Sequence, residues 1–382
     1  MRRFAITLIG VFAVLAVGLI CLMVVAIKSG GIRSEWSDIG SSNPVLVNTQ
    51  NVSLDGIDDL ILNYTWDDVV FLTSETEELT LKEYMNFSPG TDDLTQITTT
   101  GSRLKLERQR MNINNWFVGI NRYNRVEIYL PSGYGGELAV STSSGNIESD
   151  ITFNIKNFKA ASTSGDIRLN EINAETVSSS TSSGNITIDK AAGKRSFSST
   201  SGDIQILDGA GDTSAASSSG NITLKNSSGS LKASASSGDI KIENSLGEKD
   251  IETTSGQIIV NDSAGYTEAS ASSGDIRFTG FDGAGDFDTT SGSINIEYTQ
   301  NASLLPDDLY MSASSGDLIL ELPSGFSFDF SAKTSSGDIS TPFDDQLTYN
   351  KDGDYATGTI GANPSYGLEL TTTSGTIRIR NR

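Results

Sequence analysis

A tripeptide ending in Ser-Gly recurs along more than half of this chain and restricts its fold more than any other feature. Each copy reads Ser or Thr, then Ser, then Gly, and is followed by a polar residue and an aliphatic one. From Gly184 to Gly292 successive copies lie 18 residues apart, and insertions lengthen the spacing toward both ends. A fixed period of this length indicates a stacked repeat fold. The glycines of the tripeptide are Gly145, Gly165, Gly184, Gly202, Gly220, Gly238, Gly256, Gly274, Gly292, Gly316, Gly337 and Gly375.

A second glycine divides each regular unit into two halves of nine residues. These glycines are Gly193, Gly211, Gly229, Gly247, Gly265 and Gly283. In the first half, the second and fourth positions after the main glycine are apolar, as in Ile204 and Ile206, and the positions between them are mostly polar. This alternation predicts a strand with one buried face. In the second half the expected inward residues are Phe197, Ala215, Ala233, Ile251, Ala269 and Phe287, each followed two residues later by a small side chain. The interior should therefore be thin.

The repeat predicts an all-β fold, a parallel β-solenoid with about 18 residues and two main strands per turn. Neither half can bury its apolar face alone, but coils stacked about 4.8 Å apart join these faces into one column. The crossover rule favours right-handed winding. Two other solenoids fit less well. A left-handed hexapeptide helix needs an aliphatic residue every six positions, and the calcium-binding nonapeptide roll needs a Gly-Gly-x-Gly-x-Asp motif that these halves lack.

The residue after the main glycine should form a row along the outside of the solenoid. It alternates between acidic and neutral side chains in the order Asn185, Asp203, Asn221, Asp239, Gln257, Asp275 and Ser293. Alternation places the carboxylates about 9.6 Å apart, close to the Debye length at physiological salt, and so limits their repulsion. We interpret the row as a device that permits stacking rather than as a calcium ladder, whose oxygens would lie closer together.

The N-terminal segment is strongly apolar. Residues 4–27 contain no charged side chain and are long enough to cross a bilayer. Arg2 and Arg3 precede this run and favour a cytoplasmic N-terminus. A cleaved signal peptide is the alternative, although its apolar region is shorter and the residues before Lys28 form a poor cleavage site. We therefore expect one transmembrane α-helix before the solenoid, and a single-pass protein of the cell membrane with an extracytoplasmic repeat domain.

The expected domains are a transmembrane anchor (1–29), a stalk or linker (30–50), irregular β turns that cap the solenoid (51–125) and the repeat domain (126–382). Residues 51–125 lack the tripeptide but contain short apolar runs separated by polar turns such as Asp67-Asp68. The insertion at 340–367 carries Phe343, Tyr349, Tyr355 and Tyr366 and is either a C-terminal cap or a contact loop.

Composition removes most catalytic chemistry. The 382 residues include no His and one Cys, Cys21, which lies within the apolar run. These counts exclude Ser-His-Asp and Cys-His catalysis, an intrachain disulfide and a cysteine zinc site. The net charge of −21 opposes binding to nucleic acid. We expect no catalytic, cofactor-binding or metal-ligating residues, and no cofactor.

The chain resembles the bacterial putative-adhesin family of β-strand repeats, whose biochemical function is unknown. The likeness covers roughly residues 45–382 and also includes the N-terminal apolar helix. It rests on the lead-in at 126–131, the Ser-Gly-Asp/Asn-Ile copies and the closing segment 373–379. It implies a cell-envelope location and an interaction role, and it supplies no catalytic residues.

Three functions are compatible with these features. The first is a non-enzymatic structural or adhesion protein, tethered to the membrane by its N-terminal helix, with a monomeric ectodomain and an envelope glycan or protein as partner. The second is a regulatory or sensing partner in an envelope-stress system. The third is a polysaccharide-active enzyme that would use the row of Asp203, Asp239 and Asp275. Their equivalent, exposed positions give no reason for a shifted pKa.

Overall fold

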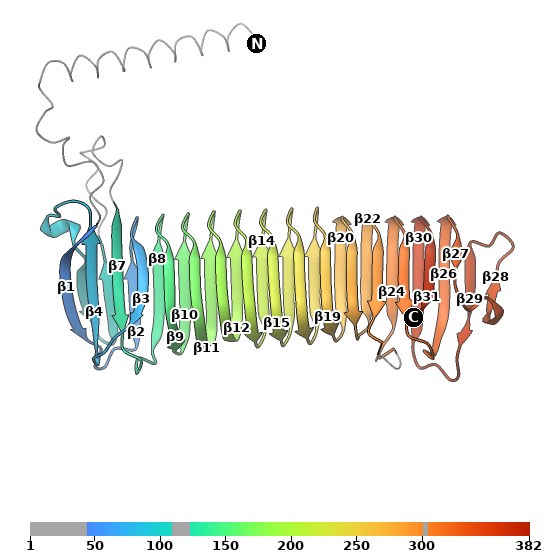
Figure 1. The fold of residues 1–382 in the computed structure, drawn as a ribbon, viewed down its shortest axis with the longest axis horizontal. Coiled ribbons are helices and arrows are strands. Elements are labelled where there is room, and N and C mark those ends of the chain that lie inside the picture. Colours follow the sequence, from blue (N-terminus) through green and yellow to red (C-terminus); the bar gives the residue numbers. More distant parts are fainter. Residues whose placement is uncertain (1–43, 109–122, 301–304) are drawn as a thin grey trace, which may run out of the picture.

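The computed structural model describes residues 44–108, 123–300 and 305–382 and shows a long rod of stacked β coils (Figure 1). Its strands form one continuous hydrogen-bonded sheet that winds around an apolar interior. Two short 3-10 turns, η1 (Thr91–Asp93) and η3 (Asp344–Gln346), lie near the two ends. The all-β, mostly parallel solenoid expected from the repeat is confirmed.

The strands fall into an N-terminal end, a regular body and a C-terminal end. The N-terminal end comprises β1 (Val45–Ser53), β2 (Asp59–Asn63), β3 (Asp68–Thr73), β4 (Glu78–Met85), β5 (Gln96–Thr100), β6 (Arg103–Glu107) and β7 (Asn124–Leu130). The body comprises β8 (Glu137–Thr142), β9 (Ile147–Asn154), β10 (Asn157–Ser162), β11 (Ile167–Thr181), β12 (Ile186–Ser199), β13 (Ile204–Ala210), β14 (Thr213–Ser217), β15 (Ile222–Ser228), β16 (Leu231–Ala235), β17 (Ile240–Leu246), β18 (Lys249–Thr253), β19 (Ile258–Ala264), β20 (Thr267–Ser273), β21 (Ile276–Phe281), β22 (Gly285–Ser291) and β23 (Ile294–Tyr298). The C-terminal end comprises β24 (Leu309–Ser315), β25 (Leu318–Leu322), β26 (Phe328–Ser336), β27 (Ile339–Ser340), β28 (Leu347–Tyr349), β29 (Tyr355–Ile360), β30 (Gly367–Ser374) and β31 (Ile377–Asn381).

Each coil of the body contributes one strand to each of two walls. The first wall contains β13, β15, β17, β19, β21, β23 and β25, and the second contains β14, β16, β18, β20, β22 and β24, all paired in parallel. In the first wall Ile204 lies opposite Ile222, which lies opposite Ile240, and all three are fully buried. This register confirms that equivalent aliphatic residues stack from coil to coil.

The second wall supplies the smaller side chains of the interior, as expected. Phe197, Ile251 and Phe287 and the alanines at equivalent positions are buried, and so are the small residues two positions later. Where the second wall does carry a ring, it packs on the first wall, since the centroids of Phe278 and Phe287 lie 5.0 Å apart. Each coil therefore fills the same narrow space with a different division of volume between the walls.

The two kinds of corner glycine are needed for different reasons. Gly211 has a φ of 106°, and the minor glycines of neighbouring coils share this left-handed backbone, which favours glycine. Gly202 does not have a positive φ, but an added Cβ would overlap the carbonyl oxygen of Gly184 in the preceding coil. The main glycine is therefore required by the close approach of stacked backbones.

At the N-terminal end the coils do not stack in sequence order. Strands β2 and β3 lie between the coil made by β6 and β7 and the coil made by β8 and β9. Antiparallel strands then cover the outermost coil: β5 pairs with β6, β4 pairs with β7, and β1 pairs with β4. The apolar runs of residues 51–108 are strands, as expected, and β1 begins within the segment expected to be a stalk.

The C-terminal end shows the same exchange of order. Strands β30 and β31 lie between β24 and β26 and between β25 and β27, so the last coil in sequence is not the last in space (Figure 1). The insertion at 340–367 covers the outermost coil, because β29 pairs antiparallel with β26 and β28 pairs with β29. The ring of Phe343 packs 5.7 Å from that of Phe328. The insertion thus forms a cap.

The expectation of a transmembrane α-helix is corrected. The part of the chain that the structure describes has no α-helix, and no helix there is long and apolar enough to cross a membrane. Over the described residues the fold class is therefore all-β, and the single-pass membrane localisation drawn from the expected helix is not supported. The apolar segment on which both rested, within residues 1–29, lies outside the described residues.

Candidate functional site

The row of residues after the main glycine is a hydrogen-bonded ladder. The Oδ1 atom of Asp203 accepts a hydrogen bond from the backbone N–H of Asn221 in the next coil at 2.7 Å. Asp239 and Asp275 accept equivalent bonds from the next coil at 2.8 Å. The asparagines take part equally, since the Oδ1 of Asn185 accepts from the N–H of Asp203 at 2.9 Å. Each of these Asp and Asn side chains thus pairs a corner N–H that the strand ladders leave free.

A second ladder runs along the buried side of the same corner. The hydroxyl of Ser199 accepts from the N–H of Gly202 at 2.8 Å and donates to the carbonyl oxygen of Gly184 at 3.3 Å. Ser217 repeats both bonds one coil later, but the equivalent position in the next coil is Ala235, which has no hydroxyl. These Ser and Asp side chains of the repeat therefore hold the corner together.

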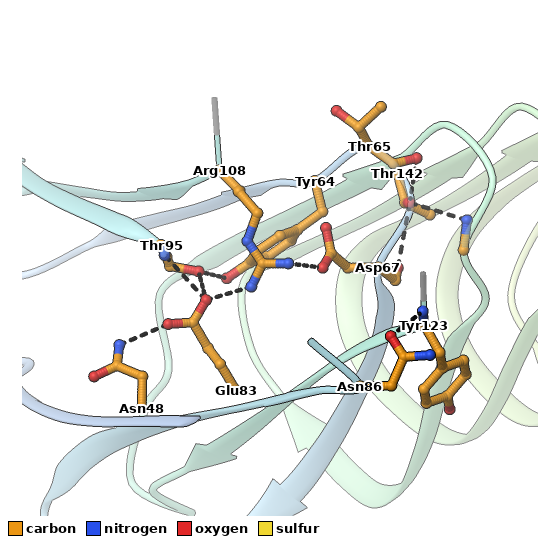
Figure 2. A network of polar contacts seen from close by, with 11 residues as sticks. Asn48, Tyr64, Thr65, Asp67, Glu83, Asn86, Thr95, Arg108, Tyr123 and Thr142 are labelled. Atoms are coloured by element: carbon orange, nitrogen blue, oxygen red, sulfur yellow. Dashed lines mark hydrogen bonds and ion pairs between the residues drawn. The ribbon is translucent and has the colours of Figure 1, made fainter. Parts of the chain in front are cut away.

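A cluster of buried charges lies at the N-terminal end of the rod (Figure 2). Arg108, which directly follows β6, forms ion pairs with Asp67 in the turn between β2 and β3 and with Glu83 on β4. Glu83 also accepts hydrogen bonds from the hydroxyl of Thr95 at 2.6 Å and from the amide of Asn48 at 2.6 Å. We call Tyr64, Asp67, Glu83, Thr95 and Arg108 the N-terminal charge cluster.

Burial dominates the electrostatics of the N-terminal charge cluster. It raises the pKa of Asp67 to about 6, against the opposing effect of Arg108, and raises the pKa of the Tyr64 hydroxyl further above its ordinary value. Arg108 lies 5.9 Å from the centroid of the Tyr64 ring. One guanidinium therefore ties three segments of the irregular end together. The Asp67-Asp68 pair was expected in a polar turn, and the burial of Asp67 could not be inferred from that motif.

A hollow with a volume of about 630 Å³ lies beside this end. Carboxylates dominate its wall, with Leu54, Ile57, Pro131, Tyr134 and Lys156 around them. The acidic residues are Asp55, Asp58, Asp59, Glu77 and Glu137. Two of them are already neutralised, Asp59 by Arg103 at 2.6 Å and Glu137 by Lys156 at 3.6 Å. Among the residues placed by the structure, no group of three acidic or Cys side chains is arranged to hold a metal ion.

Two cations are buried in the second wall without a carboxylate partner. Lys249 donates to the carbonyl oxygens of Gly247 at 2.8 Å and Ala264 at 2.7 Å, and burial lowers its pKa to about 8. Arg195 occupies the equivalent position three coils earlier and donates to the carbonyl oxygens of Ala191 and Gly211. Lys249 lies two positions before Ile251, and Arg195 lies two positions before Phe197, so all four side chains point inward. The alternation of inward and outward residues along the strand is therefore the signal in the sequence that assigns both cations to the interior.

Comparison with known proteins places the repeat in a family. A family model described as Toastrack DUF4097 matches residues 57–258, 198–307 and 245–380. No curated protein matches the chain. Among solved structures, a putative cell adhesion protein from Clostridium sporogenes is 10% identical, with a TM-score of 0.23 over 89% of this chain and 100% of that chain. A likeness of that strength carries no argument about mechanism.

Proposed function

Because this chain belongs to the Toastrack DUF4097 family, a family of unknown function, we propose that it is a non-catalytic, adhesin-like interaction scaffold. Its Ser-Gly-Asp-Ile repeat builds a stiff rod, and the outer faces of the rod bind a protein or glycan partner. The observation that carries the proposal is the use of the corner side chains. Asp203, Asp239 and Asp275 pair backbone N–H groups of the next coil, which leaves the outer strand positions as the surface free for binding.

The geometry of the rod supports binding through many weak contacts. Equivalent residues of successive coils lie about 4.8 Å apart on a flat surface, so a long partner meets the same kind of side chain repeatedly. Catalysis by the aspartate row is disfavoured, because a glycosidase needs one carboxylate held protonated beside another that is free to act. The repeated ladder gives each aspartate the same structural task.

Two measurements on the full-length chain test the proposal. Affinity capture with the purified chain, followed by mass spectrometry and a glycan array, should recover a saturable partner. A panel of polysaccharides incubated with the chain should release no reducing ends. Sugar release that is lost in an Asp239→Asn variant would refute the non-catalytic assignment.

A further inference from the structure

The two walls of the rod carry very different surface charge. On the outer side of the first wall and of β31, basic and acidic residues are nearly balanced. The basic residues are Lys225, Lys241, Arg277, Arg378 and Arg380, and the acidic ones are Asp208, Glu243, Asp262, Glu297 and Glu321. Several of them pair directly, as Lys241 does with Glu243 at 2.6 Å and Arg380 with Glu321 at 3.0 Å.

The outer side of β18, β20, β22 and β30 carries carboxylates, and β24 among them carries a tyrosine and serines; we call the surface of these five strands the acidic face. Its carboxylates are Asp250, Glu252, Glu268, Asp286, Asp288 and Glu369, and the outward positions of these five strands include no Lys or Arg. Asp250 is paired with Lys232 on β16, while the other carboxylates are exposed and form no ion pair with any described residue. Their mutual repulsion is a cost that a cationic partner would relieve.

Two exposed tyrosines flank a carboxylate of the acidic face. Tyr266 is 36% exposed and donates from its hydroxyl to the Oδ2 of Asp286 at 3.2 Å. Tyr310 is 42% exposed and lies opposite Asp286 in the strand register. The same register places Glu268 on the other side of Asp286 and Glu369 beyond Tyr310. Along this row, on successive coils about 4.8 Å apart, Tyr310 therefore lies between the carboxylates of Asp286 and Glu369.

We propose that the acidic face binds an extended, arginine-rich polypeptide segment. A guanidinium group can stack on a tyrosine ring and pair with a neighbouring carboxylate at once, and the position of Tyr310 between Asp286 and Glu369 offers that combination. A lysine ammonium pairs as a point charge and gains less from the ring. This inference rests on the interaction role proposed above and names the chemistry of the partner.

Fluorescence anisotropy of labelled peptides with the full-length chain at physiological salt tests the inference. Deca-arginine should bind at least threefold more tightly than deca-lysine. Replacing Glu268, Asp286 and Glu369 together by Lys should weaken deca-arginine binding at least tenfold. Tyr266→Ala and Tyr310→Ala should each weaken it about two- to fivefold, the range of an exposed cation–π contact, and the Tyr→Phe variants should restore it.

Matched controls separate the acidic face from the net charge of the chain. A triple variant with Asp189, Asp345 and Asp352 changed to Lys alters the charge equally at exposed sites elsewhere and should leave binding within twofold. Tyr355→Ala, at an exposed ring of the C-terminal cap, should have no effect. Equal losses in both triple variants would overturn the inference, as would face-dependent binding of hexaglucosamine without binding of deca-arginine. Absence of deca-arginine binding while affinity capture still recovers a partner would remove this inference and leave the scaffold function standing.

Discussion

Lys249 allows a direct test of how the interior of the rod sets its stability. Its side chain is buried, with the residue only 3% exposed, and its ammonium donates to two backbone carbonyl oxygens without a neutralising carboxylate. Burial lowers its pKa from 10.5 to about 8, so at pH 7 the folded protein holds a charge that the interior disfavours. The equivalent position one coil earlier is Leu231, which is buried without difficulty.

The change Lys249→Leu should therefore stabilise the protein. A pKa lowered by this amount corresponds to a cost of about 3 kcal/mol at pH 7. The substitution also removes a hydrogen bond to the carbonyl oxygen of Gly247, and this loss lowers the free energy of unfolding by about 1 kcal/mol. The carbonyl oxygen of Ala264 keeps its bond from the N–H of Gly247 at 3.1 Å. The free energy of unfolding should rise by about 2 kcal/mol at pH 7.

The pH dependence gives an independent signature of the same effect. Between about pH 8 and 10 the unfolded chain still binds the Lys249 proton while the folded protein has lost it, so stability should rise with pH. Urea unfolding at pH 7 and pH 10 should show this rise in the parent chain and a smaller one in Lys249→Leu. Lys159→Leu, at an exposed lysine of the same wall, should match the parent at both pH values. A Lys249→Leu variant that is less stable at pH 7, with the parent's pH slope, would refute the reasoning.

Three other changes test the ladders and the N-terminal charge cluster, each by urea unfolding. Asp239→Asn keeps the oxygen that accepts a hydrogen bond from the N–H of Gln257, so it should change the free energy of unfolding by less than about 0.5 kcal/mol. Asp239→Ala removes that oxygen and should cost about 1 kcal/mol. Equal effects of the two variants would argue against the ladder. Gly202→Ala places a Cβ against the Gly184 carbonyl and should cost about 3 kcal/mol or more, while Ser214→Ala on the exposed surface should cost under about 0.5 kcal/mol. Because burial raises the pKa of Asp67 to about 6, the folded protein binds more protons than the unfolded chain between about pH 4 and 6. The stability of the parent relative to Asp67→Asn should therefore fall by about 2 kcal/mol from pH 4 to pH 7, and a constant difference would contradict that pKa.

The regular body could be predicted because one physical requirement repeats in every coil. Ile204, Ile222 and Ile240 had to stack, since no single coil can enclose them, and the period fixed their register. The inward positions of the second wall followed from the same alternation. The same alternation also assigns Lys249, two residues before Ile251, to the interior. Burying a charged side chain is normally unfavourable, so the sequence alone argues against that position. The structure explains it by the two carbonyl oxygens that accept hydrogen bonds from the Lys249 ammonium.

The ends and the chemistry of the corners could not be predicted in the same way. The period predicts that coils stack, but it does not predict their order at the ends. The position of β30 between β24 and β26 depends on pairings between segments far apart in the sequence. The alternation of Asp and Asn was interpreted through charge repulsion, and the structure adds the acceptor role that both side chains share. The N-terminal charge cluster joins residues from three irregular segments, none of which carries the repeat.

The exchanged order of the terminal coils addresses a weakness common to stacked folds. A solenoid that simply ended at its chain terminus would leave its last coil paired on one side and free to fray or to pair with another molecule. Here β30 and β31 are hydrogen-bonded on both sides, and the outermost coil belongs to an internal segment whose two ends are both anchored. If that coil opened, its residues would form a loop held at both ends by the stack. Such a loop gains less conformational entropy than a free chain end would. At the other end, β2 and β3 likewise lie between the coil of β6 and β7 and the rest of the rod. Both end coils are therefore held in place by chain connectivity as well as by the antiparallel strands that cover them.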